Sequence, residues 1–223
     1  MDFDGRTVES SHYGPQYPEQ YVPDGWKGRV LFRRRRWGYD DLVQVKGNSF
    51  RGFIAALRRL HGEATAEKVI ALLPVELGRR IQRDNIVTGH WYPLEELRLV
   101  QQAMMRVVGR GSEVIRAIAR ESTLEDFRGL YQVLTFMLTP QFIIKRTPGI
   151  WRRYYDGGIV SVTARQGAGE ASFKACSGFD EAMWQGVIGG TSGVLEACGA
   201  KGLAIEILDG GVGDHMTIRA TWR

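Results

Sequence analysis

The stretch GVIGGTSGVLEACGAKGLAIEI, residues 186–207, carries the main clue to the fold. It begins with closely spaced small residues and ends in an apolar, alternating run. A phosphate-binding P-loop needs a lysine and a hydroxyl residue at fixed distances from its glycines, and a dinucleotide fingerprint needs a strand directly before them. No lysine follows these glycines at the required spacing, so the P-loop pattern is incomplete. The preceding FDEAMWQ is typical of a helix start and not of a strand, so the dinucleotide pattern is incomplete as well. The stretch is therefore not a nucleotide-binding loop.

On a helix, the small residues of this region share one sector, and the large apolar residues fill the adjoining sector. The small sector contains Ala182, Gly186, Gly189, Gly190, Gly193 and Ala197. We call this sector the glycine stripe. Each interior glycine costs about 1 kcal/mol of helix propensity relative to alanine. The stripe therefore needs compensation, and we expect it from a close approach of the helix backbone to a sheet.

Two hairpins flank this helix in the sequence. Residues 159–177 hold two alternating apolar runs on either side of Gly167-Ala168-Gly169. Residues 203–208 and 216–222 alternate in the same way around the turn sequence DGGVGD. Alternation over such lengths, interrupted by glycine-rich turns, indicates antiparallel hairpins. The C-terminal third is therefore expected to be a β-β-α-β-β unit.

The preceding part of the chain has helical periodicity. From residue 48 to residue 145, apolar residues recur at helical spacing, with Gly62 as a stop signal and Pro93 as a start. Ser122-Thr123-Leu124-Glu125 has the form of a capping box, which predicts a helix start there. We expect an α+β fold with a single domain over residues 46–223. Its helical part, 46–147, packs on the small antiparallel sheet part, 148–223, after an extended segment, 1–45, that carries a basic strand.

Composition limits the classes of protein to consider. The 223 residues and their formal net charge of +5 are ordinary for a globular protein, and no apolar run reaches the roughly 20 residues that span a bilayer. The start MDFDGRTVESS lacks the basic and apolar regions of a signal peptide, so we expect a cytoplasmic protein. With only Cys176 and Cys198, a disulfide framework is excluded, and buried thiols are favoured over a redox pair.

A basic run near the N-terminus allows three interpretations. Arg33, Arg34, Arg35 and Arg36 precede Trp37, a combination that could contact a protein partner or an anionic ligand. Arginines beside aromatic residues also occur on nucleic-acid surfaces. The modest net charge speaks against nucleic acid, and alternating arginines on a strand can simply be a solvated edge that discourages aggregation.

No catalytic or metal constellation can be assembled from the sequence. The histidines His12, His61, His90 and His215 stand in four different contexts, and no two of them share a metal-ligand spacing. The sequence contains no nucleophile elbow, no zinc-protease motif and no C-x-x-C pair. We therefore expect neither catalytic residues nor a metal site, and a non-enzymatic protein.

The C-terminal pattern resembles a known superfamily. WRRYYDGG, a hairpin, WQGVIGGTSGVLEACGAKGLAIEI and a last strand ending in ATW are similar to the core shared by 4-vinyl reductase domains, haem-NO-binding sensors and Bet3-type TRAPP subunits. The resemblance implies a pocket between a helical part and a small α/β layer, which takes an aromatic, haem or acyl group. KGNSFRGFIAALRRLHG, GHWYPLEELRLVQQAM and TPGIWRRYYDGG are also similar to an uncharacterised paralogous family of myxobacteria.

The chain departs from these families at the positions that hold cofactors. The haem sensors carry a tyrosine-x-serine-x-arginine signature, which is missing here, so we expect no haem. Vinyl-reductase-type domains often hold zinc with several cysteines near the last hairpin, and Cys176 and Cys198 are too few for such a site. The lipid-bearing TRAPP subunits use a cysteine at a helix start, where neither cysteine of this chain is expected.

Two functions from different classes are consistent with these patterns. The first is a sensory module that binds a small apolar or aromatic ligand between the helical part and the sheet. The residues expected to line that pocket are Phe136, Met137, Trp184, Ile188 and Leu195. The second is a protein-interaction or scaffold module that acts through homodimerisation or through a partner held at Arg33 to Trp37.

Overall fold

The computed structural model describes residues 43–130 and 138–223. The chain divides into two units, 1–36 and 37–223, and every described residue belongs to the second. Almost all of the expected N-terminal segment, including the partner surface from Arg33 to Trp37, therefore lies outside the described residues. So do Phe136 and Met137, two of the five residues expected to line a pocket.

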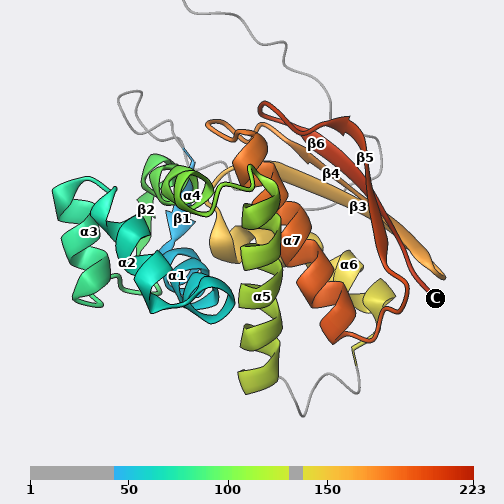
Figure 1. Ribbon diagram of the computed structural model, residues 1–223. Helices are drawn as coiled ribbons and strands as arrows, with labels where there is room; N and C mark the ends of the chain where they lie inside the picture. Colours follow the sequence, from blue (N-terminus) through green and yellow to red (C-terminus); the bar gives the residue numbers. More distant parts are fainter. Residues whose placement is uncertain (1–42, 131–137) are drawn as a thin grey trace, which may run out of the picture. The chain divides into compact units, whose positions relative to one another are not determined.

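Helices and a four-stranded sheet make up the described structure (Figure 1). The helices are α1 (Gly47–His61), α2 (Glu63–Ala71), α3 (Val75–Gln82), α4 (Leu94–Val108), α5 (Glu113–Leu130), α6 (Pro140–Tyr154) and α7 (Glu181–Ala197). The strands are β1 (Gln44–Lys46), β2 (Trp91–Pro93), β3 (Ile159–Arg165), β4 (Ala168–Lys174), β5 (Ala204–Gly210) and β6 (Met216–Thr221). No helix within the described residues is long and apolar enough to cross a bilayer.

The sheet confirms the β-β-α-β-β expectation. Its strands are antiparallel in the order β3-β4-β6-β5, so the two hairpins meet along β4 and β6. Phe173 lies opposite Met216, and Ala171 lies opposite Ile218. All four side chains are buried on the face that packs against the helices. Alternation in the sequence thus identified the inner face correctly, because successive side chains of a strand point to opposite sides.

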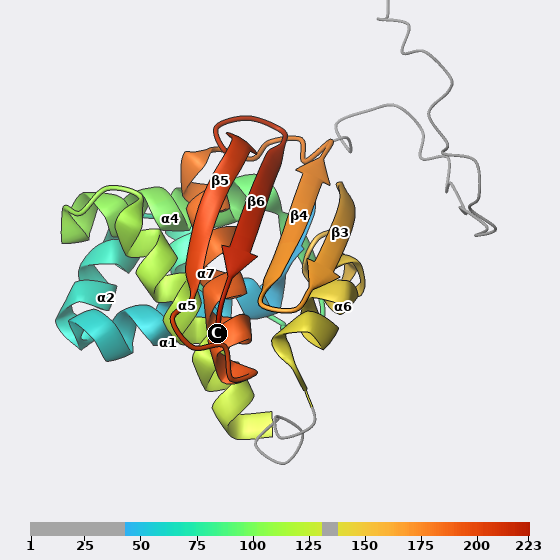
Figure 2. The ribbon, with the colours of Figure 1, turned by 90° about the vertical axis from the view of Figure 1, so that its right-hand side faces the viewer.

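The arrangement of the layers is visible in two views. In Figure 2 the sheet faces the viewer, α6 and α7 lie behind it, and α5 lies behind α7. Figure 1 shows the same order edge-on, with α7 between α5 and the sheet. The α+β fold, with a helical part packed with a small antiparallel sheet, is as the sequence predicted.

A short strand pair that sequence periodicity did not predict ties the helical part together. β1 pairs with β2 antiparallel, with Val45 opposite Tyr92. Next to this pair, the Gly47 amide donates a hydrogen bond to the His90 carbonyl over 3.0 Å. At the other end of the pair, the Leu94 amide donates to the Val43 carbonyl over 3.2 Å, so α1 and α4 begin at opposite ends of this strand pair. Segments of three residues are too short for alternation to be recognised in a sequence.

One helix start was predicted wrongly, and one helix was not predicted at all. The capping box at Ser122 was expected to begin a new helix, but α5 runs unbroken from Glu113 to Leu130. The Thr123 hydroxyl donates to the Ala119 carbonyl four residues earlier, as a residue inside a helix does, and does not cap a new helix. The helix α6 was not anticipated as a separate element, although Thr139 caps it by accepting a hydrogen bond from the Phe142 amide. The expected division after residue 147 falls inside α6.

The glycine stripe faces α5 and not the sheet, which corrects the expected packing. A Cβ on Gly189 would overlap the Arg116 carbonyl oxygen, and one on Gly193 would lie 2.7 Å from the Arg120 carbonyl oxygen. Both carbonyl oxygens are backbone atoms of α5. Real Cβ atoms do not approach this closely, so only glycine permits the observed distance between the two helices. The compensation for poor helix propensity is therefore helix-on-helix contact.

The large-residue sector of α7 faces the sheet side instead. Trp184 has no exposed surface, and its indole nitrogen donates to the Gly213 carbonyl over 2.7 Å. Its ring centroid lies 4.6 Å from that of Phe179 and 5.9 Å from that of Phe173. Further along α7, Leu195 is buried in one apolar cluster with Ala220 of β6. The two sectors were identified correctly from the sequence, but the sheet was assigned to the small sector and in fact meets the large one.

Two alanine substitutions on the same stripe test this packing. We expect Gly189→Ala to lower the free energy of unfolding by about 1–3 kcal/mol or more, because its methyl group would overpack against the α5 backbone. We expect Gly190→Ala to be neutral or stabilising, since among the described residues a Cβ there would meet only the Thr123 hydroxyl, at 3.5 Å. Urea unfolding of both variants measures the difference. Equal stability of the two variants would contradict the proposed contact.

Candidate ligand-binding cavity

A cavity of about 570 Å³ lies where α5, α6 and α7 meet, with part of α1 and one residue of β4. Its size is in the range of pockets that hold small organic ligands. Several of its lining residues on α6, among them Phe142 and Gly149, are exposed, so this side is where the cavity meets solvent. The cavity is not a sealed void in the core.

Apolar side chains form most of the described wall. Phe53 contributes from α1, and Val187 contributes from α7. The remaining large apolar lining residues are Phe127, Leu138, Phe142, Ile143, Ile144, Ile150, Trp151, Phe173, Val194 and Leu195. Such a wall favours a ligand that loses water-exposed apolar surface on binding.

The glycine stripe also borders this cavity. Gly189 and Gly193 pack on α5, whereas Gly186 and Gly190 line the cavity. The space beside Gly190 is open enough to hold a methyl group in ordinary contact with Thr123. A Cβ on Gly186 would already contact Phe53, at 3.5 Å, so glycine at these two positions keeps side-chain volume out of the cavity. One stripe therefore serves both for helix packing and as a cavity wall.

Three threonine hydroxyls of the wall are already engaged, whereas a buried amide oxygen is not. The hydroxyls of Thr123, Thr147 and Thr191 donate to the carbonyls four residues earlier, so toward a ligand they can only accept. The side-chain oxygen of Asn48 is buried, with no hydrogen-bond partner among residues 43–130 and 138–223. An unpaired buried oxygen is costly, and a ligand donor would satisfy it.

Three ionisable groups line the cavity within the described residues, apart from its tyrosines, and two of them are cationic. Asp126 lies on α5, and burial raises the pKa of its carboxyl, an effect that the Arg59 charge opposes. Arg146 and Arg153 lie on α6, and both side chains are exposed. The Arg146 guanidinium lies 5.0 Å from the centroid of the Phe142 ring, within the range of a cation–π contact.

The structure places the expected pocket residues in different environments. Leu195 lines the cavity and has no exposed surface. Trp184 and Ile188 are also almost fully buried, but their side chains pack within the main core and do not belong to the described lining. Phe136 and Met137 lie outside the described residues. The expected role of Phe136 and Met137 as pocket residues stays a prediction.

Most of the wall was missed because α6 was not anticipated. Phe142, Arg146, Gly149 and Arg153 recur at the spacing of one helical face, and all four line the cavity. A cap and a proline at Thr139-Pro140 precede them in the sequence. That start signal could have indicated the helix. Pro148 inside the segment argued against it, because proline removes a helix hydrogen bond.

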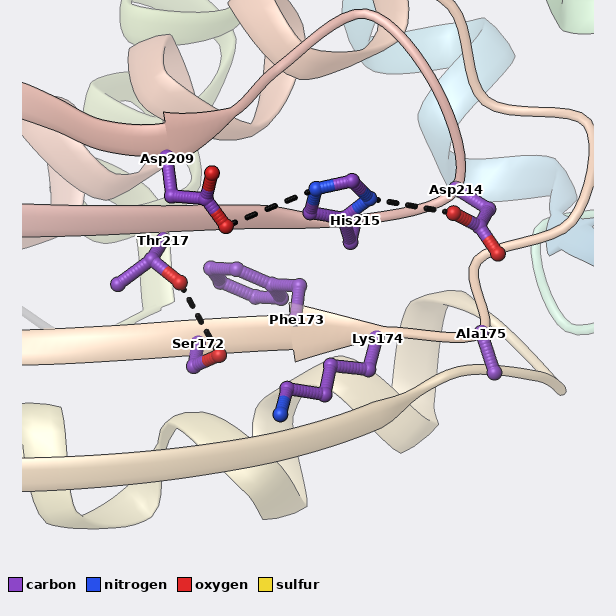
Figure 3. Close-up of a pocket in the computed structure, with 8 residues that line it drawn as sticks. All are labelled: Ser172, Phe173, Lys174, Ala175, Asp209, Asp214, His215 and Thr217. Carbon is purple, nitrogen blue, oxygen red and sulfur yellow. Dashed lines mark hydrogen bonds and ion pairs between the residues drawn. The ribbon is translucent and has the colours of Figure 1, made fainter. Parts of the chain in front are cut away.

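A second, smaller hollow lies on the outer face of the sheet (Figure 3). The His215 imidazole stands between two carboxylates, 3.6 Å from Asp209 and 3.2 Å from Asp214. Nearby, the Thr217 hydroxyl donates to Ser172. All three side chains are half exposed or more, so these contacts contribute little to stability. No group of three or more His, Cys, Asp or Glu in the described part of the chain could hold a metal ion.

Comparison with known proteins gives a fold but no sequence family. No family model and no curated protein matches the chain. Solved H-NOX structures do match. An unliganded Fe(II) H-NOX protein from K. algicida has a TM-score of 0.60 at 13% identity, with 80% of this chain and 96% of that chain covered. An oxygen-binding H-NOX domain related to soluble guanylate cyclases has a TM-score of 0.59 at 13% identity, with coverages of 80% and 95%.

A variant of the T. tengcongensis H-NOX protein is similar to the same degree, with a TM-score of 0.58, 13% identity, and 80% and 97% coverage. These matches support the haem-NO-binding part of the expected resemblance. No family model or sequence match supports the 4-vinyl reductase, TRAPP or myxobacterial parts. At such low identity the likeness concerns the fold alone, and this chain has the fold of the H-NOX domains.

The described lining does not fit haem. Haem iron is held by histidine, cysteine, methionine or tyrosine side chains. No described lining residue is a histidine, cysteine or methionine. Of the two lining tyrosines, Tyr154 already interacts with another group. Burial raises the pKa of Tyr155 far above its usual range, which disfavours the phenolate that would bind iron.

We therefore expect the purified protein to carry neither haem nor stoichiometric zinc. The described lining provides no haem ligand, and the described residues contain no cluster that could hold a metal ion. An absorption spectrum of the protein as isolated tests for haem, and elemental analysis tests for zinc. A Soret band, or one equivalent of zinc per chain, would show that this expectation is wrong.

The two cysteines should be inert in the folded protein. Burial raises the pKa of Cys176 to about 12 and that of Cys198 to about 11. Because only the thiolate reacts with alkylating reagents, both thiols should resist iodoacetamide at about pH 8 and react once the protein is unfolded. Mass spectrometry counts the alkylated sites. Rapid alkylation of either cysteine in the native protein would contradict the burial described here.

Proposed function

We propose that this chain is a non-enzymatic sensory domain that binds a small, mainly apolar or aromatic ligand in the cavity between α5, α6 and α7. The observation that carries the proposal is the cavity itself, about 570 Å³ in volume and lined chiefly by apolar side chains. An apolar hollow that meets solvent exposes surface that a purely structural protein would gain stability by covering. Binding of a ligand would explain why this apolar cavity is left open.

The fold supports this proposal by analogy. One structure with the same fold is an oxygen-binding domain related to soluble guanylate cyclases, and another concerns the mechanism of H-NOX activation. Small-molecule binding is thus known among proteins of this fold. Fold alone does not determine function, so the analogy raises the expectation of a ligand without naming it. The cytoplasmic location expected from the sequence belongs to the same proposal.

The described chemistry of the cavity favours binding over catalysis. A general base needs a titratable group poised near its reacting partner, and a nucleophile needs an adjacent base. No described lining residue is a histidine, lysine or cysteine, and three of its hydroxyls are committed to backbone carbonyls. The only described carboxylate in the wall is that of Asp126. We therefore propose no reaction at this site.

A ligand in this cavity would touch elements from both halves of the fold. Its walls belong to α1 and α5 on one side and to α6 and α7 on the other. A ligand that bridges these walls stabilises their relative position by the free energy of its binding. This gives a physical route from occupancy to a conformational signal. The scaffold alternative depends on Arg33 to Trp37, which lie outside the described residues, and stays a hypothesis.

Filling the cavity should abolish binding. Phenylnaphthylamine, a neutral aromatic probe that fluoresces in apolar surroundings, should bind the wild-type protein saturably. Thr191 lines the cavity from α7, so Thr191→Trp should remove this binding by occupying the space. Thr163→Trp makes the same change at an exposed position of β3 that does not line the cavity, and it should bind normally. Fluorescence titration gives the affinities, and thermal melting confirms that both variants fold.

The proposal fails if the wild-type protein does not bind the probe saturably, or if Thr191→Trp binds as well as Thr163→Trp. Where the titration succeeds, extraction of the protein purified from its natural host, followed by mass spectrometry, identifies the natural ligand. A compound retained by wild type and lost from Thr191→Trp is the expected result.

A further inference from the structure

We infer that the ligand of this cavity is an amphiphile with an anionic group, bound between Arg146 and Arg153 where the cavity meets solvent. The inference rests on the proposed function, because it names the class of ligand for the same cavity. Both arginines line the cavity, and they are the only lysine or arginine residues among its described lining residues. Every other cationic side chain of the described structure lies elsewhere.

The spacing of the two arginines suits a single head group. Positions 146, 149 and 153 fall on one face of α6, so the two guanidinium groups rise from the same side of the helix, two turns apart. Gly149 lies between them, and a Cβ on Gly149 would meet no atom of the described residues within 4 Å. No described residue therefore covers the helix surface between the arginines, which leaves room for a group that both side chains can reach.

The electrostatic environment leaves these charges available. Several arginines of the described structure are paired with carboxylates, for example Arg80 with Glu96 and Arg98 with Asp180. Neither Arg146 nor Arg153 has a carboxylate within ion-pair distance among residues 43–130 and 138–223. Their charge is opposed in the wall only by Asp126, whose carboxyl is partly desolvated. An anionic ligand would therefore be attracted more strongly than a cationic one.

The distribution of polar and apolar groups also sets the orientation of the ligand. Burying an ion without partners is costly, so the anionic group must stay at the exposed side, where both guanidiniums can donate hydrogen bonds. The apolar body then lies along Ile150 and against Leu195 deeper in the wall. The exposed Phe142 ring, which already contacts Arg146, lies at the same opening. A neutral apolar compound would leave both arginines unused.

A matched pair of probes tests the inference on the full-length protein. Anilinonaphthalene sulfonate has the ring system of phenylnaphthylamine with one added sulfonate group. The double variant Arg146→Gln/Arg153→Gln should bind the sulfonate at least about tenfold more weakly than wild type, because two charge-assisted contacts are lost. Its affinity for the neutral amine should change by less than about twofold. Added salt should weaken binding of the sulfonate to wild type and leave the amine unaffected.

The control removes the same charge from the same helix. Lys145 and Arg152 are exposed residues of α6 that do not line the cavity, so Lys145→Gln/Arg152→Gln should bind both probes as wild type does. An equal loss of sulfonate affinity in the two double variants would overturn the inference, since general charge would then explain it. So would an unchanged sulfonate affinity in Arg146→Gln/Arg153→Gln. If wild type binds neither probe, the proposed function itself fails.

Discussion

The close approach of α5 and α7 is the contact on which the rest of this structure depends. Gly189 and Gly193 place bare backbone against the Arg116 and Arg120 carbonyls of α5. Thr123 packs against the same surface, and Arg120 pairs with Glu196 across the two helices. Because no side chain separates the backbones, the helical half and the sheet half are held at a fixed spacing. The weak helix propensity of α7 is the cost of that spacing.

This contact also decides where a cavity can form. With its small sector committed to α5, α7 turns its large sector toward the sheet, where Trp184 and Leu195 complete the apolar clusters. The other two glycines of the stripe, Gly186 and Gly190, border the cavity, near Phe53 of α1 and Thr123 of α5. Apolar side chains surround that space without filling it. In the proposed function, such mainly apolar walls would select a ligand by shape and hydrophobicity, and the two arginines would set its orientation.

The comparison with H-NOX structures separates fold from chemistry. The backbone arrangement is shared with H-NOX structures, one of which concerns haem redox potential, yet the described cavity of this chain offers no suitable iron ligand. Side-chain chemistry can diverge on a common frame because packing constrains the backbone more tightly than it constrains the lining of a hollow. The likeness therefore gives the fold of this chain without giving its ligand.

The sequence by itself determined the α+β class, the two hairpins and the sectors of α7, because periodicity and turn residues are local properties of a chain. It could not determine which neighbour each sector of α7 meets, since helix-on-helix and helix-on-sheet contact both accept small residues. It also missed α6, where Pro148 obscured a helical face that carries much of the cavity wall. Only the tertiary structure brought Thr191, Phe53 and Arg146 around one space. Residues from separate helices converge through packing, and no pattern along the chain records that convergence.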